Sequence, residues 1–324
     1  MILVTGGAGY IGSHYVQYAR ESGAEIVVLD NLAFGHREAV PDDVPLIVGD
    51  MGDRGILDSL FSDYRIDAVV HFAAFAYVGE SVTAPSKYYR NNTVAALCVL
   101  DAMLAHNVRT FVFSSTCATY GDPLAVPMDE THPQNPINPY GESKYFVERM
   151  LRAYDRAYGL KFISLRYFNA AGCDPAGRIG ESHDPETHLI PLLLQTATGQ
   201  RDRVSIFGSD YDTPDGTCIR DYVHVLDLAA AHDLALHRLL NGGASDFYNL
   251  GSERGYSVNE VVAACERISG RPIRTVAAPR RPGDPPRLVA SAAKARADLG
   301  WSPQYQELDP IVATAWNWER KRGY

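Results

Sequence analysis

The chain has 324 residues, of which 46% are hydrophobic and 21% are charged, as in ordinary globular proteins. Its formal net charge of −9 argues against broad binding to nucleic acid, and an anionic ligand would need a local basic clamp. The absence of any apolar run of roughly 18 residues argues against a transmembrane helix, and five scattered cysteines without a CxxC spacing argue against a disulfide framework or a zinc site.

The first half alternates short apolar runs with amphipathic stretches. It opens on a buried strand instead of a signal peptide, so we expect a cytoplasmic protein. The repeated β-α-β spacing predicts a doubly wound, parallel, Rossmann-like α/β sheet. The predicted strands are Ile2–Thr5, Glu25–Asp30, Pro45–Val48, Ala68–Phe72, Thr110–Ser114 and Phe162–Arg166, and the predicted helices are Ile11–Ser22, Gly55–Tyr64, Asn91–His106 and Pro139–Tyr158.

The second half is less regular and holds loop-like stretches at Gly208–Thr217 and Pro279–Pro286. Val258–Ser269 and Ala292–Leu299 are predicted to be helices, and 247–250 is a predicted strand that returns to the sheet. We therefore expect a smaller second α/β lobe.

A glycine-rich turn joins the first strand to the first helix. Gly6, Gly9 and Gly12 would permit a tight turn and close approach of a pyrophosphate to the helix N-terminus, although the register through Gly7 fits the same pattern. Asp30 ends the next strand, where a carboxylate accepts hydrogen bonds from an adenosine ribose and repels a 2′-phosphate. These features predict a site for NAD. Asp50 and the Phe72-Ala73-Ala74 segment also follow strands, at the edge where such sheets bind ligands.

Tyr140 and Lys144 lie four residues apart near the start of a predicted helix, with Asn138 as its N-cap and Pro139 in its first turn. Residues at this spacing share one helix face. A nearby ammonium group stabilises a phenolate, so we expect the pair to form a general base for a hydroxyl proton. A Tyr–Lys surface pair without function is the alternative. Thr116, at the end of the fifth strand, could bridge a substrate hydroxyl and the tyrosine oxygen.

These motifs resemble the extended short-chain dehydrogenase/reductase family, and within it the 4-epimerases of UDP-hexoses. The similarity covers essentially the whole chain. It is carried by VTGGAGYIGSH at 4–14, LDNL at 29–32, HFAA at 71–74, VGES at 78–81, FSST at 113–116, NPYGESK at 138–144, LRYFNAAG at 165–172, HLIP at 188–191, IFGSDYDTPDGTCIRDYVHV at 206–225, YNLG at 248–251 and RRPGD at 280–284.

The resemblance implies an NAD-binding domain at 1–168, joined by a returning strand at 247–250, and a mainly UDP-sugar-binding domain at 169–324, interleaved with the first. It implies that Tyr140 is the base, that Lys144 assists it and that Thr116 orients the sugar. The implied NAD contacts are Gly6, Gly9, Tyr10, Ile11, Gly12, Asp30, Asn31, Asp50, Met51, Phe72, Ala73, Ala74, Asn91, Ser114, Tyr140, Lys144 and Phe168.

The resemblance also implies contacts to the UDP-sugar, and a pair of arginines would supply the basic clamp. The implied substrate residues are Thr116, Tyr140, Asn169, His188, Leu189, Arg220, Arg281 and Leu288. Four positions depart from some family members: Thr116 replaces serine, His188 replaces asparagine, Ala76 replaces lysine and Leu288 replaces tyrosine. Because leucine is smaller than tyrosine, Leu288 could leave room for an N-acetyl group.

The implied reaction is inversion of C4 through a 4-keto sugar, with bound NAD taking and returning a hydride, in galactose metabolism. UDP-N-acetylhexosamines and UDP-pentoses are alternative substrates. A 4,6-dehydratase is disfavoured because Cys117-Ala118-Thr119 supplies no carboxylate after Thr116, and a non-catalytic NAD-binding protein would not need Thr116, Tyr140 and Lys144.

Two smaller expectations remain. His183 and His188 with Asp184 match no standard metal-ligand spacing, so we predict no metal. The family resemblance implies a homodimer that forms through the Asn91–His106 and Tyr140 helices.

Overall fold

The computed structural model describes residues 1–281 and 284–324, so Pro282 and Gly283 of the RRPGD motif lie outside the described residues. A seven-stranded parallel sheet forms its centre, in the order β11-β6-β5-β4-β1-β2-β3. Its strands are β1 (Ile2–Thr5), β2 (Ile26–Asp30), β3 (Leu46–Val48), β4 (Ala68–His71), β5 (Thr110–Thr116), β6 (Lys161–Tyr167) and β11 (Asp246–Leu250). The predicted doubly wound α/β sheet is confirmed, and its strand order reverses between β1 and β4.

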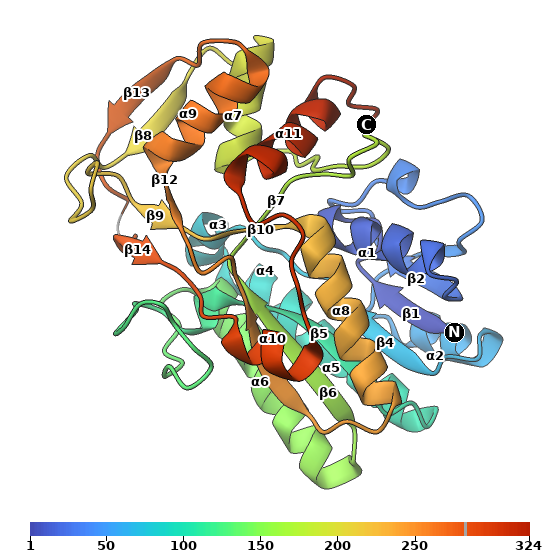
Figure 1. Ribbon diagram of the computed structural model, residues 1–324. Helices are drawn as coiled ribbons and strands as arrows, with labels where there is room; N and C mark the ends of the chain where they lie inside the picture. Colours follow the sequence, from blue (N-terminus) through green and yellow to red (C-terminus); the bar gives the residue numbers. More distant parts are fainter. Residues whose placement is uncertain (282–283) are drawn as a thin grey trace.

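Helices cover both faces of this sheet, because its central strands are apolar on both sides. One face packs against α1 (Tyr10–Glu21), α8 (Val225–Leu240) and α10 (Ala293–Leu299). The other packs against α2 (Arg54–Asp63), α5 (Ala95–Ala105) and α6 (Pro139–Tyr158). In Figure 1, α1 and α8 lie side by side although more than half of the chain separates them.

The remaining helices and strands build a second core around α7 (Leu189–Thr198), α9 (Val258–Ser269) and α11 (Leu308–Glu319). Figure 1 shows these three helices together, away from the outer helices of the large sheet. Three small sheets accompany them: β10-β7, β12-β9-β14 and β13-β8. Their strands are β7 (Asn169–Ala171), β8 (Val204–Phe207), β9 (Ile219–Arg220), β10 (Tyr222–His224), β12 (Tyr256–Ser257), β13 (Thr275–Ala278) and β14 (Arg287–Leu288).

The predicted helix at Asn91–His106 is not a single α-helix. A π-helical turn, Tyr89–Val94, precedes α5, and the short helices α3 (Val78–Thr83) and α4 (Pro85–Tyr88) lead into it. The buried side chain of Asn92 donates to the Phe75 carbonyl at 2.9 Å and to Ser143 Oγ at 3.0 Å. Such wide turns are frequent at functional sites. Two short 3₁₀ turns, Arg37–Ala39 and Cys117–Thr119, complete the elements.

No helix in the described parts of the chain has both the length and the apolar character to cross a membrane. All five cysteines are free, as expected from their number and spacing.

Candidate active site

The glycine turn lies at the point where the strand order reverses. Gly6 has a φ of +73°, and a Cβ there would lie 2.4 Å from the backbone nitrogen of Ala73, beyond the end of β4. A Cβ on Gly12 would lie 2.1 Å from the Gly6 carbonyl oxygen. Backbone packing therefore requires glycine at positions 6 and 12. Helix α1 begins directly after Gly9, so its N-terminal amide groups face the turn, as a pyrophosphate site requires.

Asp30 ends β2 beside this turn and is 8% exposed. Its Oδ2 accepts from the Ala8 amide at 2.9 Å, and its Oδ1 accepts from the Leu32 amide at 2.8 Å. Burial raises the pKa of this carboxyl, although the two amide hydrogen bonds oppose that effect. The side chain is thus held in place, and its remaining lone pairs can accept from ribose hydroxyls.

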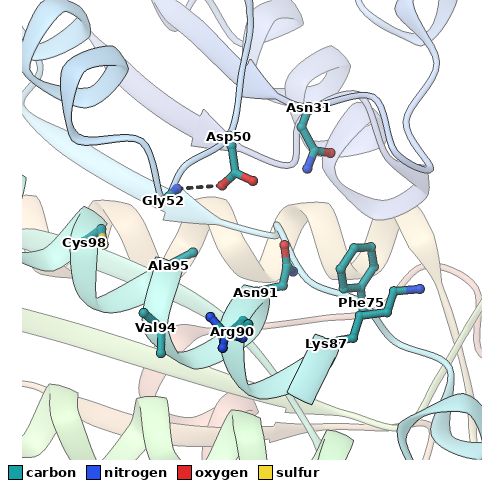
Figure 2. Close-up of a pocket in the computed structure, with 10 residues that line it drawn as sticks. All are labelled: Asn31, Asp50, Gly52, Phe75, Lys87, Arg90, Asn91, Val94, Ala95 and Cys98. Atoms are coloured by element: carbon teal, nitrogen blue, oxygen red, sulfur yellow. Dashed lines mark hydrogen bonds between the residues drawn. The ribbon is translucent and has the colours of Figure 1, made fainter. Parts of the chain in front are cut away.

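A cavity of about 430 Å³ opens next to Asp30. Figure 2 shows Asn31 and Asp50 on one side of it, facing the helical segment that carries Arg90 and Asn91. Asp50 Oδ1 accepts from the Gly52 amide at 2.7 Å. The structure therefore brings together three of the residues that the family resemblance assigned to NAD: Asn31, Asp50 and Asn91. The π-helical turn supplies three of the residues that line the far wall, Arg90, Asn91 and Val94.

The other predicted cofactor residues are not among those that line this cavity. The Phe72 ring packs on His232, with ring centroids 4.5 Å apart, so its backbone rather than its ring faces the glycine turn. The Tyr10 hydroxyl donates to the Gly172 carbonyl at 2.5 Å and so links α1 to the second lobe. Met51 and Phe168 are buried, Ile11 packs on the core, Ala74 is half-buried, and Ser114 Oγ is 2.5 Å from the Tyr167 hydroxyl.

The predicted catalytic residues meet where α6 begins and β5 ends. Asn138 caps α6 by accepting from the Gly141 amide at 2.9 Å, which confirms the predicted cap. Lys144, 3% exposed, donates through Nζ to the Ser114 carbonyl at 2.8 Å and lies 4.9 Å from the centre of the Phe113 ring. Thr116, the last residue of β5, is 6% exposed, and its hydroxyl acts to lower the pKa of Tyr140. Thr116 and Lys144 are buried, Tyr140 is half-buried, and all three lie where α6 meets the end of β5.

The pKa of Tyr140 differs from the expectation that Lys144 would lower it. Burial raises the pKa of Tyr140 well above its ordinary value, and the Thr116 hydroxyl only partly offsets this. Burial also lowers the pKa of Lys144 to about 7, although the carboxylate of Glu148 acts in the opposite direction. The protein alone therefore favours a neutral phenol, because both groups have lost their water.

Three predicted substrate residues lie near one another on short strands of the second lobe. Leu288 of β14 stands opposite Arg220 of β9 and packs on Phe168 and its neighbours. Asn169 Nδ2 donates to the Asp221 carbonyl at 2.8 Å. Arg220 pairs with Asp284 and donates through Nη1 to the Ile219 carbonyl at 2.8 Å, which leaves other N–H groups of its guanidinium for a ligand.

Arg281 is exposed, with its guanidinium 4.0 Å from the centre of the Phe207 ring. Burial raises the pKa of the Cys218 thiol, and the positive charges of Arg220 and Arg281 oppose that shift. Both positive charges therefore act on the same residue, and the clamp stays a prediction.

His188 and Leu189 lie at the start of α7. Leu189 is its first residue and is half-buried, while His188 precedes it. The Nδ1 atom of His188 lies 2.9 Å from both Glu186 Oε1 and Glu181 Oε1, so that side of the ring faces carboxylates.

Several residues of the site were not among those predicted from the sequence. Lys87, Arg90 and Cys98 line the cavity, and Glu148 lies one helical turn after Lys144 on α6. Glu148 pairs with Arg166 of β6 at 2.7 Å, and both side chains are at most 2% exposed. The 140–144–148 spacing was visible in the sequence, but a partner on β6 was not.

The fold and this site define the class of protein. The profile of the NAD dependent epimerase/dehydratase family matches residues 2–251, and the chain belongs to that family. It is 53% identical to the UDP-glucose 4-epimerase of Halalkalibacterium halodurans, over all of this chain and 97% of that protein. The resemblance seen in the sequence is thereby confirmed.

Solved structures agree with this family assignment. A crystal structure of a UDP-glucose 4-epimerase superimposes with a TM-score of 0.98 at 50% identity and covers 100% of this chain and 99% of its own. The enzyme from Brucella ovis, solved in complex with NAD, gives a TM-score of 0.95 at 48% identity and covers 97% of each chain.

Proposed function

We propose that this protein is an NAD-dependent epimerase that inverts C4 of UDP-glucose and UDP-galactose. The observation that carries the proposal is the convergence of Thr116, Tyr140 and Lys144 where α6 meets the end of β5, in a sheet whose first turn requires glycine at positions 6 and 12. The full-length similarity to UDP-glucose 4-epimerases supports the same reaction and substrate pair.

The turn, Asp30 and the cavity walls fit NAD. Gly6 and Gly12 keep the backbone open for a pyrophosphate, Asp30 accepts from ribose hydroxyls, and the cavity takes the remainder of the nucleotide. When bound, NAD supplies a reversible hydride acceptor for C4, and its oxidised ring carries a positive charge. Asp30 disfavours NADP because a carboxylate at this position repels a 2′-phosphate.

Tyr140 then serves as the general base. It takes the proton of the C4 hydroxyl as C4 becomes a ketone, and it returns that proton after the sugar has presented its other face. Thr116 orients the hydroxyl through its contact with Tyr140. Because burial raises the pKa of Tyr140, forming the phenolate requires the positive charge of Lys144 together with that of the occupied site.

Leu288 provides a specific reason to test a second substrate class. Its side chain is half-buried beside Phe168, and a leucine occupies less space than a tyrosine. We therefore include UDP-N-acetylgalactosamine among the substrates to be tested. Elimination chemistry lacks support, since Cys117, Ala118 and Thr119 follow Thr116 without a carboxylate.

Chromatography of reaction products tests the function. The purified protein is incubated with UDP-galactose and with UDP-N-acetylgalactosamine, and no NAD is added. We expect UDP-glucose to form from UDP-galactose, because a retained cofactor returns each hydride that it takes. Denatured protein should release NAD and little NADP.

The control for this experiment is the Tyr140→Phe protein. It should carry NAD but should not form product at a rate comparable to that of the wild-type protein. Failure of the wild-type protein to convert UDP-galactose would overturn the substrate assignment. Release of mainly NADP would refute the role given to Asp30, and a product formed only with added NAD would refute the retained cofactor.

The diphosphate clamp gives a separate prediction. Arg220→Ala and Arg281→Ala should each weaken UDP binding, by about 2–5 kcal/mol where the lost charge contact is desolvated. Arg220, with a side chain 12% exposed, should show the larger loss. Calorimetric titration with UDP measures the effect. Arg274→Ala is the matched control, because Arg274 forms an exposed pair with Asp202. Unchanged affinity in both clamp variants would remove these arginines from the site.

We also propose a homodimer in the cytoplasm. Val94, at the end of the π-helical turn, and Phe146 of α6 are 54% and 37% exposed, which supports association through this side of the protein. Five free thiols suit a reducing compartment.

A further inference from the structure

Four metal-ligating side chains converge in the segment that leads into α7. They are Glu181, His183, Glu186 and His188, and one nitrogen or oxygen atom from each lies within 4.8 Å of the others. Neither carboxylate faces open solvent, because their side chains are only 5–6% exposed.

His188 Nδ1 hydrogen bonds to Glu186 Oε1 at 2.9 Å, but two other atoms of the cluster have no such partner. Glu181 Oε1 lies 3.3 Å from His183 Nδ1 and 2.9 Å from His188 Nδ1. Even so, Glu181 Oε1 and His183 Nδ1 are buried without a hydrogen-bond partner. An unsatisfied buried acceptor on a carboxylate is costly. Something other than a hydrogen from a neighbouring side chain must satisfy these lone pairs.

The spacing fits coordination of a small cation. Tetrahedral zinc has bonds of about 2.0–2.1 Å to nitrogen and oxygen, so its ligand atoms lie about 3.3–3.4 Å apart. The His183 Nδ1 atom is 3.3 Å from Glu181 Oε1 and 3.5 Å from Glu186 Oε2. The His188 contacts are 2.9 Å, slightly shorter. Two imidazole nitrogens and two carboxylates form a donor set that suits zinc and related divalent metals.

We propose that Glu181, His183, Glu186 and His188 bind a divalent transition-metal ion, with zinc as the ion that this ligand set fits best. The two carboxylate charges balance the ion while both imidazoles stay neutral. The prediction of no metal rested on His183, Asp184 and His188. The structure replaces Asp184 in that set with the carboxylates of Glu181 and Glu186.

A network of protonated histidines is the competing explanation. Burial lowers the pKa of His183, but the two carboxylates outweigh it and raise the value to about 9. Two imidazolium ions would also neutralise two carboxylates. A protonated His183, however, would direct its Nδ1 hydrogen at an acceptor, and that atom makes no hydrogen bond. A metal ion accounts for this orientation directly.

Four protein ligands leave no open coordination position, which is typical of a structural metal. The bound ion would fix the 181–188 segment between the two lobes. The His183 ring packs edge-on against Tyr10 of α1, with centroids 6.1 Å apart, and the Tyr77 hydroxyl donates to the Pro185 carbonyl at 3.0 Å. His188 directly precedes α7, so the ion would also set where that helix begins.

Metal analysis of the untagged, NAD-loaded protein tests this proposal without reference to activity. We expect about one zinc ion per chain after gel filtration, and binding of Co²⁺ with the visible absorption of a tetrahedral site after chelation and dialysis. Glu181→Gln and His183→Gln should lose the metal. A chelator should lower the melting temperature of the wild-type protein and leave that of Glu181→Gln unchanged, because only the former binds metal.

The matched control is His237→Gln, which alters an exposed histidine paired with Asp233 on α8. It should retain the metal. Wild-type protein that binds neither Zn²⁺ nor Co²⁺ after chelation would establish the histidine–carboxylate network instead. Equal metal loss in His237→Gln and His183→Gln would show adventitious binding to surface histidines and would overturn the proposal. If the single variants do not fold, the Co²⁺ spectrum of the wild-type protein still decides the question.

Discussion

Tyr140→Phe should lower turnover by at least about 10²–10⁴-fold, the typical effect of losing a general base. The substitution removes only the hydroxyl that we propose takes the C4 proton, and it keeps the ring at its place in α6. The fold and the bound NAD should therefore survive. Steady-state rates with UDP-galactose measure the loss, and the absorbance of bound cofactor after denaturation shows that the site remains loaded.

Two neighbouring variants sharpen this result. Thr116→Ser should stay active, since the hydroxyl that contacts Tyr140 remains, whereas Thr116→Val should lose activity. Lys144→Met removes a positive charge, which raises the pKa of Tyr140 further. Because the base acts when deprotonated, the acid limb of the pH–rate profile should move to higher pH. A folded, NAD-loaded Tyr140→Phe protein with near-native activity would disprove the assignment of Tyr140 as base.

Breaking the buried Glu148–Arg166 pair should give the largest loss of stability. Arg166 Nε and Nη2 donate to the two oxygens of Glu148 at 2.9 and 2.7 Å, and Ser115 and Ser164 also donate to Oε1. Glu148→Gln keeps the shape but leaves a buried guanidinium uncompensated. We expect a loss of about 3–5 kcal/mol in the free energy of unfolding, measured by urea denaturation at fixed NAD saturation.

Two further measurements separate charge from packing. The double variant Glu148→Leu/Arg166→Met should recover much of the loss, because it removes both charges. Burial raises the pKa of Glu148, but Arg166 more than offsets this and lowers it overall. The stabilisation is therefore present above the unfolded value of about 4.3 and is lost as pH falls below it. Arg267→Ala, in an exposed pair with Asp309, should change little. A similarly small change in Glu148→Gln would contradict the argument.

The first half of the fold was predictable because its physical signals are local. Strands covered on both faces are unbroken apolar runs, and β1, β2 and β4 are buried along almost their whole length. The helix caps and the glycine turn also follow from neighbouring residues. Predicted ends differ from the observed ones by one or two residues at several elements, as at β5, which runs on to Thr116.

The helices α7, α8 and α11 were not predicted. For α8 and α11 the reason is the burial of polar residues. Helix α11 buries residues on most of its surface, including Thr314 and Glu319, so it lacks the polar face that marks an amphipathic helix. Helix α8 buries Asp227 and His232 among apolar side chains. Polar residues at core positions interrupt the apolar periodicity from which a helix is inferred.

The candidate site also contains residues that local patterns predict and residues that only the folded chain brings together. Tyr140 and Lys144 are related by helical spacing, and Thr116 ends a strand, so local pattern and family resemblance located them. The partner of Glu148 could not be located in this way, because Arg166 comes from another element and only pairing of β5 with β6 brings it close. The carboxylates around His183 were not predicted, because their spacing in the sequence matches no standard metal motif. Only the folded loop brings them close to His183.

The position of β11 has a consequence for synthesis of the chain on the ribosome. This strand pairs with β6, and its Tyr248 and Leu250 are fully buried, yet it is made only after the strands and helices from β7 to α8. A nascent chain that ends before residue 250 therefore leaves one edge of the large sheet open and part of its core exposed to water. The large sheet therefore cannot complete its folding until β11 has been made.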